Sequence, residues 1–327
     1  MTDRILRWGL LSTARINRAL IPPLRASPRN ELLAVASRDL DRAKAYAKES
    51  SIPRAFGTYE AMLADPDIDV IYNPLPNHLH AEWTIKATQA GKHVLCEKPM
   101  ALSVAEVDAM EAAARKVGVV VAEAFMYRHH PQTTKVKELV DGGAIGAVQV
   151  VRGTFTFNLT NEGDVRLYPE MGGGSVWDVG CYPVSYSRYV LGAEPVEVFG
   201  WQVTGPTGID EVFAGQMRFA SGAYAQFDSG FRSPYRAHIE IVGSEGSIGV
   251  PHPFHPGLNE RILLSRGGED VQTIAVPGED LYIGEVEDMA DAILLGNPPR
   301  VSLADSRANV AAILALLQSA RERRPVP

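Results

Sequence analysis

The chain has 327 residues, of which 46% are apolar and 22% charged, and its net charge is −7 at neutral pH. This composition predicts a folded chain long enough for two domains and excludes a disordered one. Acidic and basic residues are mixed without a basic block, so neither nucleic acid nor an anionic membrane is an expected partner.

Cysteine usage and hydropathy indicate the compartment. The two cysteines, Cys96 and Cys181, are far apart in sequence, which argues against a disulfide framework or a thiolate metal site. No run of about 18 apolar residues would span a membrane, and the N-terminus lacks the pattern of a secretion signal. We therefore expect a cytoplasmic protein.

Up to about residue 124, short apolar runs alternate with helical patterns. Strand-like runs occur at 5–11, 31–37, 54–56, 70–73, 93–96 and 119–124. Helical periodicity covers 39–50, 58–65, 80–91 and 103–118. Alternation of this kind predicts a mostly parallel sheet with helices on both of its faces.

Beyond a helix at about 132–140 the sequence becomes rich in strands. The runs lie at 147–157, 196–205, 212–220, 223–231 and 236–243, with a glycine-rich helical segment at 172–191 and helices at 282–295 and 303–323. Strands joined by short turns favour an antiparallel sheet. We predict two domains, a dinucleotide-binding domain at 1–125 and a substrate-binding α/β domain at 126–327.

The first strand ends in "RWGLLSTARIN", where a dinucleotide fingerprint would need small residues at the turn. Ser12 and Ala14 replace two of the fingerprint glycines, and Asn17 replaces the third. Taken alone, the stretch fits an ordinary strand-to-helix turn equally well. The cofactor contacts predicted here are Gly9, Ser12, Thr13, Ala14 and Ile16.

The second strand ends in Ser37 and Arg38, where an acidic residue would select NAD. A guanidinium instead favours the 2′-phosphate of NADP, which makes NAD the less favoured cofactor. Arg38 could also be an ordinary surface residue, with Asp39 either pairing with it or capping the next helix.

The fourth strand ends in "NPLPNHLH", whose two prolines shape a loop at the edge of the sheet where ligands bind. The histidines have no suitably spaced acidic or cysteine partner, so no metal is expected. The cofactor contacts predicted here are Asn73, Pro74, Leu75, Asn77 and His80.

Two further motifs carry groups able to move protons. "CEKP" places Glu97 and Lys98 at the end of the fifth strand, and Pro99 restricts the lysine backbone to extended conformations and permits a cis bond. In "GGGSVWDVGCYPVSY", Asp178 and Tyr182 share one face if the segment is helical, although Pro183 should break or kink that helix. A lysine cation near a tyrosine stabilises its phenolate. Lys98 could equally be a loop lysine paired with Glu97.

Together, the degenerate fingerprint, "NPLPNHLHAEW", "AGKHVLCEKP", "EAFMYRHHPQ" and "GGGSVWDVGCYPVSY" resemble the Gfo/Idh/MocA oxidoreductases over nearly the whole chain. "STARI" and "SR" are similar to the branch with glucose-fructose oxidoreductase, NADP-dependent xylose and glucose dehydrogenases and dimeric dihydrodiol dehydrogenase. The resemblance implies an N-terminal Rossmann domain with a doubly wound, mostly parallel sheet, followed by an α/β domain with a large open, predominantly antiparallel sheet. It also implies a homodimer or homotetramer formed through that sheet.

The resemblance also implies residue roles. Lys98 matches the lysine beside the nicotinamide and contributes, with Glu97, to cofactor binding, while Tyr182 matches the catalytic tyrosine or histidine. The substrate contacts it implies are Asp178, Tyr127, Arg128, Arg166 and Tyr282. Tyr282 could instead be a packing aromatic.

These observations predict reversible hydride transfer between NADP and a hydroxyl or carbonyl carbon of a small sugar or related cyclic polyol. Tyr182 would exchange the hydroxyl proton, and Lys98 would stabilise the developing alkoxide. A keto-sugar or nucleotide-keto-sugar reductase would use the same residues in reverse. An NAD-dependent glycosidase and a non-catalytic NADPH sensor are the remaining alternatives.

Overall fold

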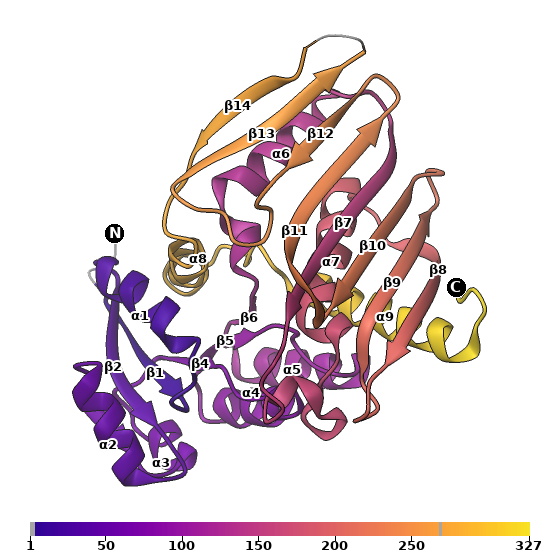
Figure 1. Ribbon diagram of the computed structural model, residues 1–327. Coiled ribbons are helices and arrows are strands. Elements are labelled where there is room, and N and C mark those ends of the chain that lie inside the picture. The colour runs from indigo at the N-terminus through magenta and orange to yellow at the C-terminus, as the bar shows by residue number, and fades with distance from the viewer. Residues whose placement is uncertain (1–3, 268–269) are drawn as a thin grey trace. The chain divides into compact units, whose positions relative to one another are not determined.

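The computed structural model describes residues 4–267 and 270–327, which form two compact units (Figure 1). The first unit comprises Met1–Met126 and Tyr282–Arg307, and the second comprises Tyr127–Leu281 and Ala308–Pro327. This division differs from the predicted one, in which residues 282–307 belong to the second domain. This segment packs with the first unit because the apolar side of its helix, including Val286 and Met289, joins the hydrophobic core there.

The first unit contains a six-stranded sheet in which every strand pair is parallel, as predicted. The strands are β1 (Leu6–Leu11), β2 (Asn30–Ala36), β3 (Arg54–Phe56), β4 (Val70–Asn73), β5 (His93–Glu97) and β6 (Val121–Ala124). Their order is β3-β2-β1-β4-β5-β6. Strands β2 and β3 are added on one side of β1, and β4, β5 and β6 on the other, so the strand order reverses between β1 and β4. In open α/β sheets, ligands bind at the carboxyl ends of the strands at such a point.

The helices of the first unit alternate with its strands. They are α1 (Asn17–Ala26), α2 (Leu40–Glu49), α3 (Tyr59–Leu63), α4 (His80–Gln89), α5 (Val104–Val117) and α8 (Ile283–Leu294), with the short η1 (Asn77–Leu79) and η2 (Met126–His129). Leu6, Trp8 and Leu10 of β1 are fully buried in a core with apolar side chains of α1 and α8. Gly9 faces the other way, and a Cβ added there would lie 3.0 Å from the Met62 sulfur. This glycine therefore permits close packing inside the sheet.

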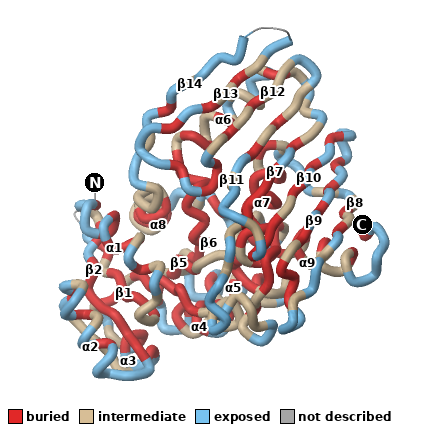
Figure 2. The backbone as a smooth tube through the Cα atoms, viewed as in Figure 1, coloured by how far each residue is buried: buried red, intermediate tan, exposed pale blue. Residues whose placement is uncertain are grey.

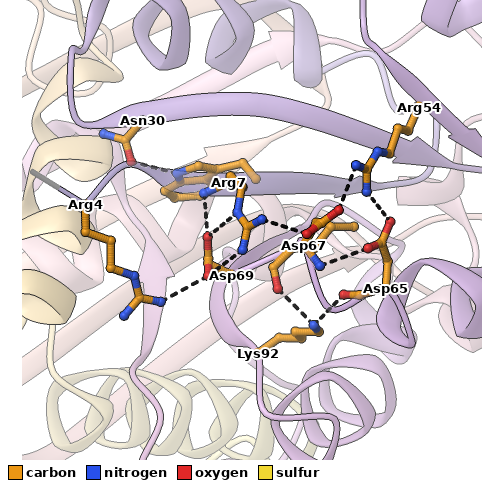
Figure 3. Close-up of polar contacts among 10 residues, drawn as sticks. Arg4, Arg7, Asn30, Arg54, Asp65, Asp67, Asp69 and Lys92 are labelled. Carbon is orange, nitrogen blue, oxygen red and sulfur yellow. Dashed lines mark hydrogen bonds and ion pairs between the residues drawn. The ribbon is translucent and has the colours of Figure 1, made fainter.

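Ion pairs gather at the amino end of this sheet, opposite the ligand-binding edge (Figure 3). Arg7 of β1 binds Asp67 at 2.9 Å and Asp69 at 3.0 Å. Arg54 of β3 binds Asp65 at 2.8 Å and Asp67 at 2.7 Å. These contacts hold the loop before β4 against β1 and β3, so they support the sheet without occupying its ligand-binding edge.

The second unit contains an eight-stranded sheet of order β14-β13-β12-β11-β7-β10-β9-β8. Its strands are β7 (Val148–Asn158), β8 (Pro195–Thr204), β9 (Asp210–Phe219), β10 (Tyr224–Gly230), β11 (Arg232–Gly243), β12 (Gly246–Val250), β13 (Asn259–Arg266) and β14 (Gln272–Pro277). Among the described strands of this sheet only β7 and β10 pair in parallel, which confirms the predicted antiparallel character. β12, β13 and β14 were not among the predicted strands; β14 is largely exposed (Figure 2) and so lacks a buried apolar face.

The remaining helical elements are α6 (Pro131–Asp141), η3 (Val165–Leu167), η4 (Pro169–Met171), the π-helical η5 (Val176–Gly180), α7 (Cys181–Leu191) and α9 (Leu303–Glu322). α7 packs on β7, where a Cβ at Gly153 would come within 2.7 Å of the Pro183 side chain. Among the described residues, no helix is long and apolar enough to cross a membrane.

Candidate active site

The turn between β1 and α1 has the backbone conformation that the fingerprint requires. Ser12 has a φ of 83°, in the left-handed region that glycine usually occupies. Asn17, at the third glycine position, is buried and its side-chain amide donates to the Ser12 carbonyl at 2.9 Å. The N-cap residue Ile16 makes no side-chain cap, and the first turn of α1 holds no acidic residue. The first turn of α1 therefore holds neither a side-chain cap nor an acidic group that would repel a phosphate.

A second arginine, which the sequence analysis missed, lies beside this turn. Arg42 of α2 donates through Nε to the Thr13 hydroxyl at 2.9 Å. Arg38 and Arg42 both act on Tyr59, whose pKa is raised by burial and pulled down by the two cations. The position of Arg42 one helical turn beyond Arg38 was the available signal, because both would then lie near the end of β2.

Asp39 is the N-cap of α2. Its carboxylate accepts from the backbone N–H groups of Asp41 at 2.9 Å and Arg42 at 3.1 Å. Of the two roles left open for Asp39, the structure therefore shows the helix cap. The side chain of Arg38 is exposed, and no ion-pair partner is found for it among the described residues.

The loop after β4 is held from inside the unit. The two ring nitrogens of His80 face carbonyl oxygens on different loops, Nε2 at 2.7 Å from Leu75 and Nδ1 at 2.8 Å from Pro99. Asn73 donates to the His80 carbonyl at 3.1 Å. Both Asn73 and His80 are completely buried, whereas Asn77 is partly exposed. His80, predicted as a cofactor contact, thus lies behind the loop and joins it to the segment that carries Lys98.

Lys98 follows β5 in a segment fixed by its neighbour Glu97. One Glu97 carboxylate oxygen accepts from the Tyr72 hydroxyl at 2.5 Å, and the other accepts from the Lys98 backbone N–H at 3.2 Å. Burial and the Glu97 charge raise the pKa of Tyr72, so this phenol stays protonated and keeps donating. The Lys98–Pro99 peptide bond is cis, and the Lys98 side chain is partly exposed.

The helix that carries Tyr182 starts against a buried carboxylate. Gly174 has a φ of 128°, and a Cβ there would lie 2.3 Å from an Asp210 carboxylate oxygen. The other oxygen accepts from the Ser175 hydroxyl at 2.7 Å and from the Val176 N–H at 2.8 Å. Burial raises the pKa of Asp210 to about 6. Sequence patterns gave no sign of Asp210, because it lies 35 residues beyond Ser175 on another element.

The expected break at Pro183 does not occur. The segment is π-helical over η5 and continues as α7 through Pro183, the third residue of α7. A proline is tolerated in the first turn of an α-helix, because the missing N–H would lack an intrahelical acceptor there. The proline therefore coincides with a change of helix type just before it.

Asp178 and Arg166, both predicted as substrate contacts, are ion-paired. Arg166 Nε lies 2.8 Å from an Asp178 oxygen, and another guanidinium nitrogen lies 3.2 Å from Asp164. The Asp178 charge raises the pKa of Arg166. The positive charge of Arg166 is thus balanced by two carboxylates on its own unit.

Tyr182 lies in a cluster of aromatic rings. Its ring centroid is 5.2 Å from that of Phe155, 5.3 Å from Phe254, 5.7 Å from Tyr127 and 6.3 Å from His255. Tyr182 is only 3% exposed, whereas His255 is exposed. The sequence analysis missed Phe155, Phe254 and His255, because their distance from Tyr182 along the chain hides the contact.

The other predicted substrate contacts pack against side chains of their own units. Tyr127 is fully buried and its hydroxyl donates to the Ser185 hydroxyl at 2.9 Å, which Arg128 also contacts at 3.2 Å. The Arg128 guanidinium lies 4.1 Å from the centroid of the Tyr189 ring. Tyr282, at the N-terminus of α8, packs against the core of the first unit.

Both units match known family models. Residues 6–125 match the oxidoreductase family with an NAD-binding Rossmann fold, and residues 133–249 match the GFO/IDH/MocA C-terminal domain. The chain is also 39% identical to D-xylose 1-dehydrogenase (NADP(+)) 2 of Haloferax volcanii, over 96% of this chain and 97% of that protein. The chain belongs to the Gfo/Idh/MocA oxidoreductase family.

Solved structures agree with this assignment. The 3-ketoreductase of Actinomadura kijaniata, in complex with NADP and TDP-benzene, superimposes with a TM-score of 0.92 at 30% identity, covering 97% of this chain and 98% of that one. The aldose-aldose oxidoreductase of Caulobacter crescentus, with glycerol bound, also gives a TM-score of 0.92, at 28% identity and 99% coverage of both chains. Homologues of this oxidoreductase thus include an NADP-dependent sugar dehydrogenase and a ketoreductase.

Proposed function

We propose that this oxidoreductase uses NADP to oxidise a hydroxyl group of a small free sugar or related cyclic polyol. The observation that carries the proposal is the nearly buried phenol of Tyr182, which follows by four residues the Asp178 that is ion-paired with Arg166. The similarity to an NADP-dependent xylose dehydrogenase supports it. The first unit would bind the cofactor, and the second would bind the substrate.

Arg38 and Arg42 would hold the 2′-phosphate of NADP. Ser37, which lies between β2 and α2, would contribute its hydroxyl to the same site. Asp39 is engaged by the N-terminus of α2, so it offers no carboxylate to select NAD. Arg38→Gln and Arg42→Gln should each lower the ratio of kcat/KM for NADP⁺ to that for NAD⁺ by about tenfold or more, because each removes a charged hydrogen-bond donor. Arg115→Gln, on an exposed helix, is the control. An unchanged ratio in both variants would exclude this phosphate site.

Two side chains would move the proton and stabilise charge. Bound NADP supplies the hydride chemistry. Tyr182 removes the hydroxyl proton, and the Lys98 ammonium stabilises the alkoxide that develops as this proton leaves. Tyr182→Phe should lower kcat by about 10² or more while leaving the Kd for NADPH nearly unchanged. Near-normal turnover in this variant would remove Tyr182 from the role.

The substrate would be uncharged. Arg166 is already paired with Asp164 and Asp178, so its charge is compensated before any pyrophosphate of a nucleotide-linked sugar could bind. Asp178 would then accept hydrogen bonds from sugar hydroxyls. Rates of NADP⁺ reduction with pentoses, hexoses, inositols and cyclic diols test this. Turnover confined to NADPH oxidation with keto-sugars or nucleotide-linked keto-sugars would establish the reductase, which the similarity to the 3-ketoreductase favours.

The second sheet offers a surface for a second copy of the chain. Its open face exposes Trp201 at 60% and Val203 at 50%, next to a hollow of about 540 Å³ lined in part by Phe199, Gln216 and His238. We propose a homodimer or homotetramer built through this face. Trp201→Glu should dissociate it in analytical ultracentrifugation, whereas Leu258→Glu, at an exposed loop position, should not.

The proposed location is the cytoplasm. Cys96 and Cys181 are both buried, and neither forms a disulfide. Burial also raises the pKa of the Cys96 thiol, which keeps it unreactive. Fractionation of cells that produce the protein tests this location.

A further inference from the structure

Oxidation of a hydroxyl group releases one proton in every turnover, and Tyr182 is placed poorly to deliver it to water. Its side chain is 3% exposed. A phenol that has taken up the substrate proton must lose it again before the next turnover. The ring therefore needs a neighbour that binds a proton near neutral pH and also meets solvent.

Four rings surround Tyr182 in the second unit, and they differ in what they can do. Phe155 and Phe254 carry no group that binds a proton. Tyr127 is fully buried, and its hydroxyl donates to Ser185 at 2.9 Å. His255 alone among these four combines an ionisable ring with exposure to solvent.

We propose that His255 carries the proton from Tyr182 to water. The hydroxyl O–H bond of the substrate breaks and its proton passes to the Tyr182 oxygen, while the carbon gives up hydride to NADP⁺. The phenol proton then passes to a ring nitrogen of His255 and from there to solvent, which restores the phenolate. This inference rests on the proposed function of Tyr182.

The packing around His255 suits this task. Its ring meets Phe155 edge-on at 5.6 Å and Tyr182 at 6.3 Å, so two contacts hold it beside the phenol. Two further titratable rings belong to this cluster. Tyr235 meets Phe155 at 6.1 Å and Tyr186 meets Phe254 at 6.3 Å, and burial raises the pKa of both. Tyr235 and Tyr186 therefore stay protonated at neutral pH and cannot accept the proton in place of His255.

The same loop supplies a matched control. His252 lies three residues earlier, is also exposed, and places Nδ1 3.1 Å from a Glu260 oxygen. No ring contact with Tyr182 is found for it among the described residues. His255→Phe keeps an aromatic ring against Phe155, and His252→Phe makes the same chemical change away from Tyr182.

Stopped-flow measurement separates the two chemical events. NADPH absorbance reports hydride transfer, and a pH indicator in weak buffer reports proton release. In His255→Phe we expect NADPH to form in the first turnover at close to the wild-type rate, with proton release slowed about tenfold or more. Added imidazole should restore release, and His252→Phe should match the wild type.

The outcomes separate the role of His255 from the proposed function. Wild-type proton release in His255→Phe, or equal slowing in His252→Phe, would overturn the role of His255. Absence of NADPH formation in the wild type with every sugar, or full activity of Tyr182→Phe, would overturn the proposed function. A pH profile of kcat that keeps its shape in His255→Phe would also contradict the relay.

Discussion

Asp210 offers the sharpest test of how the helix of Tyr182 is held. Its pKa is about 6 in the folded chain against an ordinary value of 3.8, because burial penalises the carboxylate more than the Ser175 and Val176 hydrogen bonds stabilise it. A raised pKa means that the folded chain binds the proton more tightly than the unfolded chain does. The proton on Asp210 therefore contributes about 3 kcal/mol to the free energy of unfolding below pH 3.8, and this contribution is lost as the pH rises through about 6.

Asp210→Asn removes this titration and keeps an oxygen that can accept from Ser175 and Val176. Between about pH 8 and pH 5, the wild type should gain about 1.4 kcal/mol in free energy of unfolding relative to this variant. Urea unfolding followed by tryptophan fluorescence and circular dichroism measures the difference, and titrations common to both proteins cancel.

The exposed Asp141→Asn serves as the control, and its difference from the wild type should change little with pH. Parallel pH profiles for the wild type and Asp210→Asn would refute the raised pKa. If the wild type instead gained free energy of unfolding relative to Asp210→Asn as the pH rises, the fold would stabilise the carboxylate and the pKa of Asp210 would be lowered.

Three other changes test the supports around the site. His80→Phe should lower the free energy of unfolding by about 1 to 3 kcal/mol, because burial lowers the pKa of His80 to about 4 and the single N–H of the neutral ring is the donor that one buried carbonyl loses. An unchanged thermal midpoint would contradict this role. Asp69→Asn should cost about 1 kcal/mol near neutral pH. The Arg7 contacts lower the pKa of Asp69 in the folded chain below 3.8. This stability is therefore present above pH 3.8 and is lost as the pH falls through the folded-state pKa, which unfolding measurements in acid would reveal. Gly174→Ala should lower the free energy of unfolding by about 2 kcal/mol or more, because φ is positive there and a Cβ would contact Asp210. Gly143→Ala is the control and should cost about 1 kcal/mol, because φ is positive there but no atom lies within 4 Å of the added Cβ. Equal thermal midpoints for the two variants would count against the close contact at Gly174.

Local sequence rules were strongest where a residue acts through its neighbours along the chain. The helix α5 begins at Ser103, whose hydroxyl accepts from the Glu106 N–H at 3.2 Å, and ends at Gly118 with a φ of 79°, as its capping pattern predicts. Ser12 adopts a glycine-like φ in the turn that the sequence identified. The same rules did not indicate that the helix continues without a break through Pro183, where a π-helical turn directly precedes the first turn of α7.

The sequence by itself determined the parallel first sheet, the antiparallel second sheet and the family, because periodicity, turns and motifs are written in consecutive residues. Only the tertiary structure decided that Asp210 anchors the helix of Tyr182, that Arg166 is neutralised by Asp178, and that His255 lies against Tyr182. These contacts join elements separated in the chain, and their formation depends on the burial and packing of the whole unit. Residue order alone does not encode which distant side chains will meet.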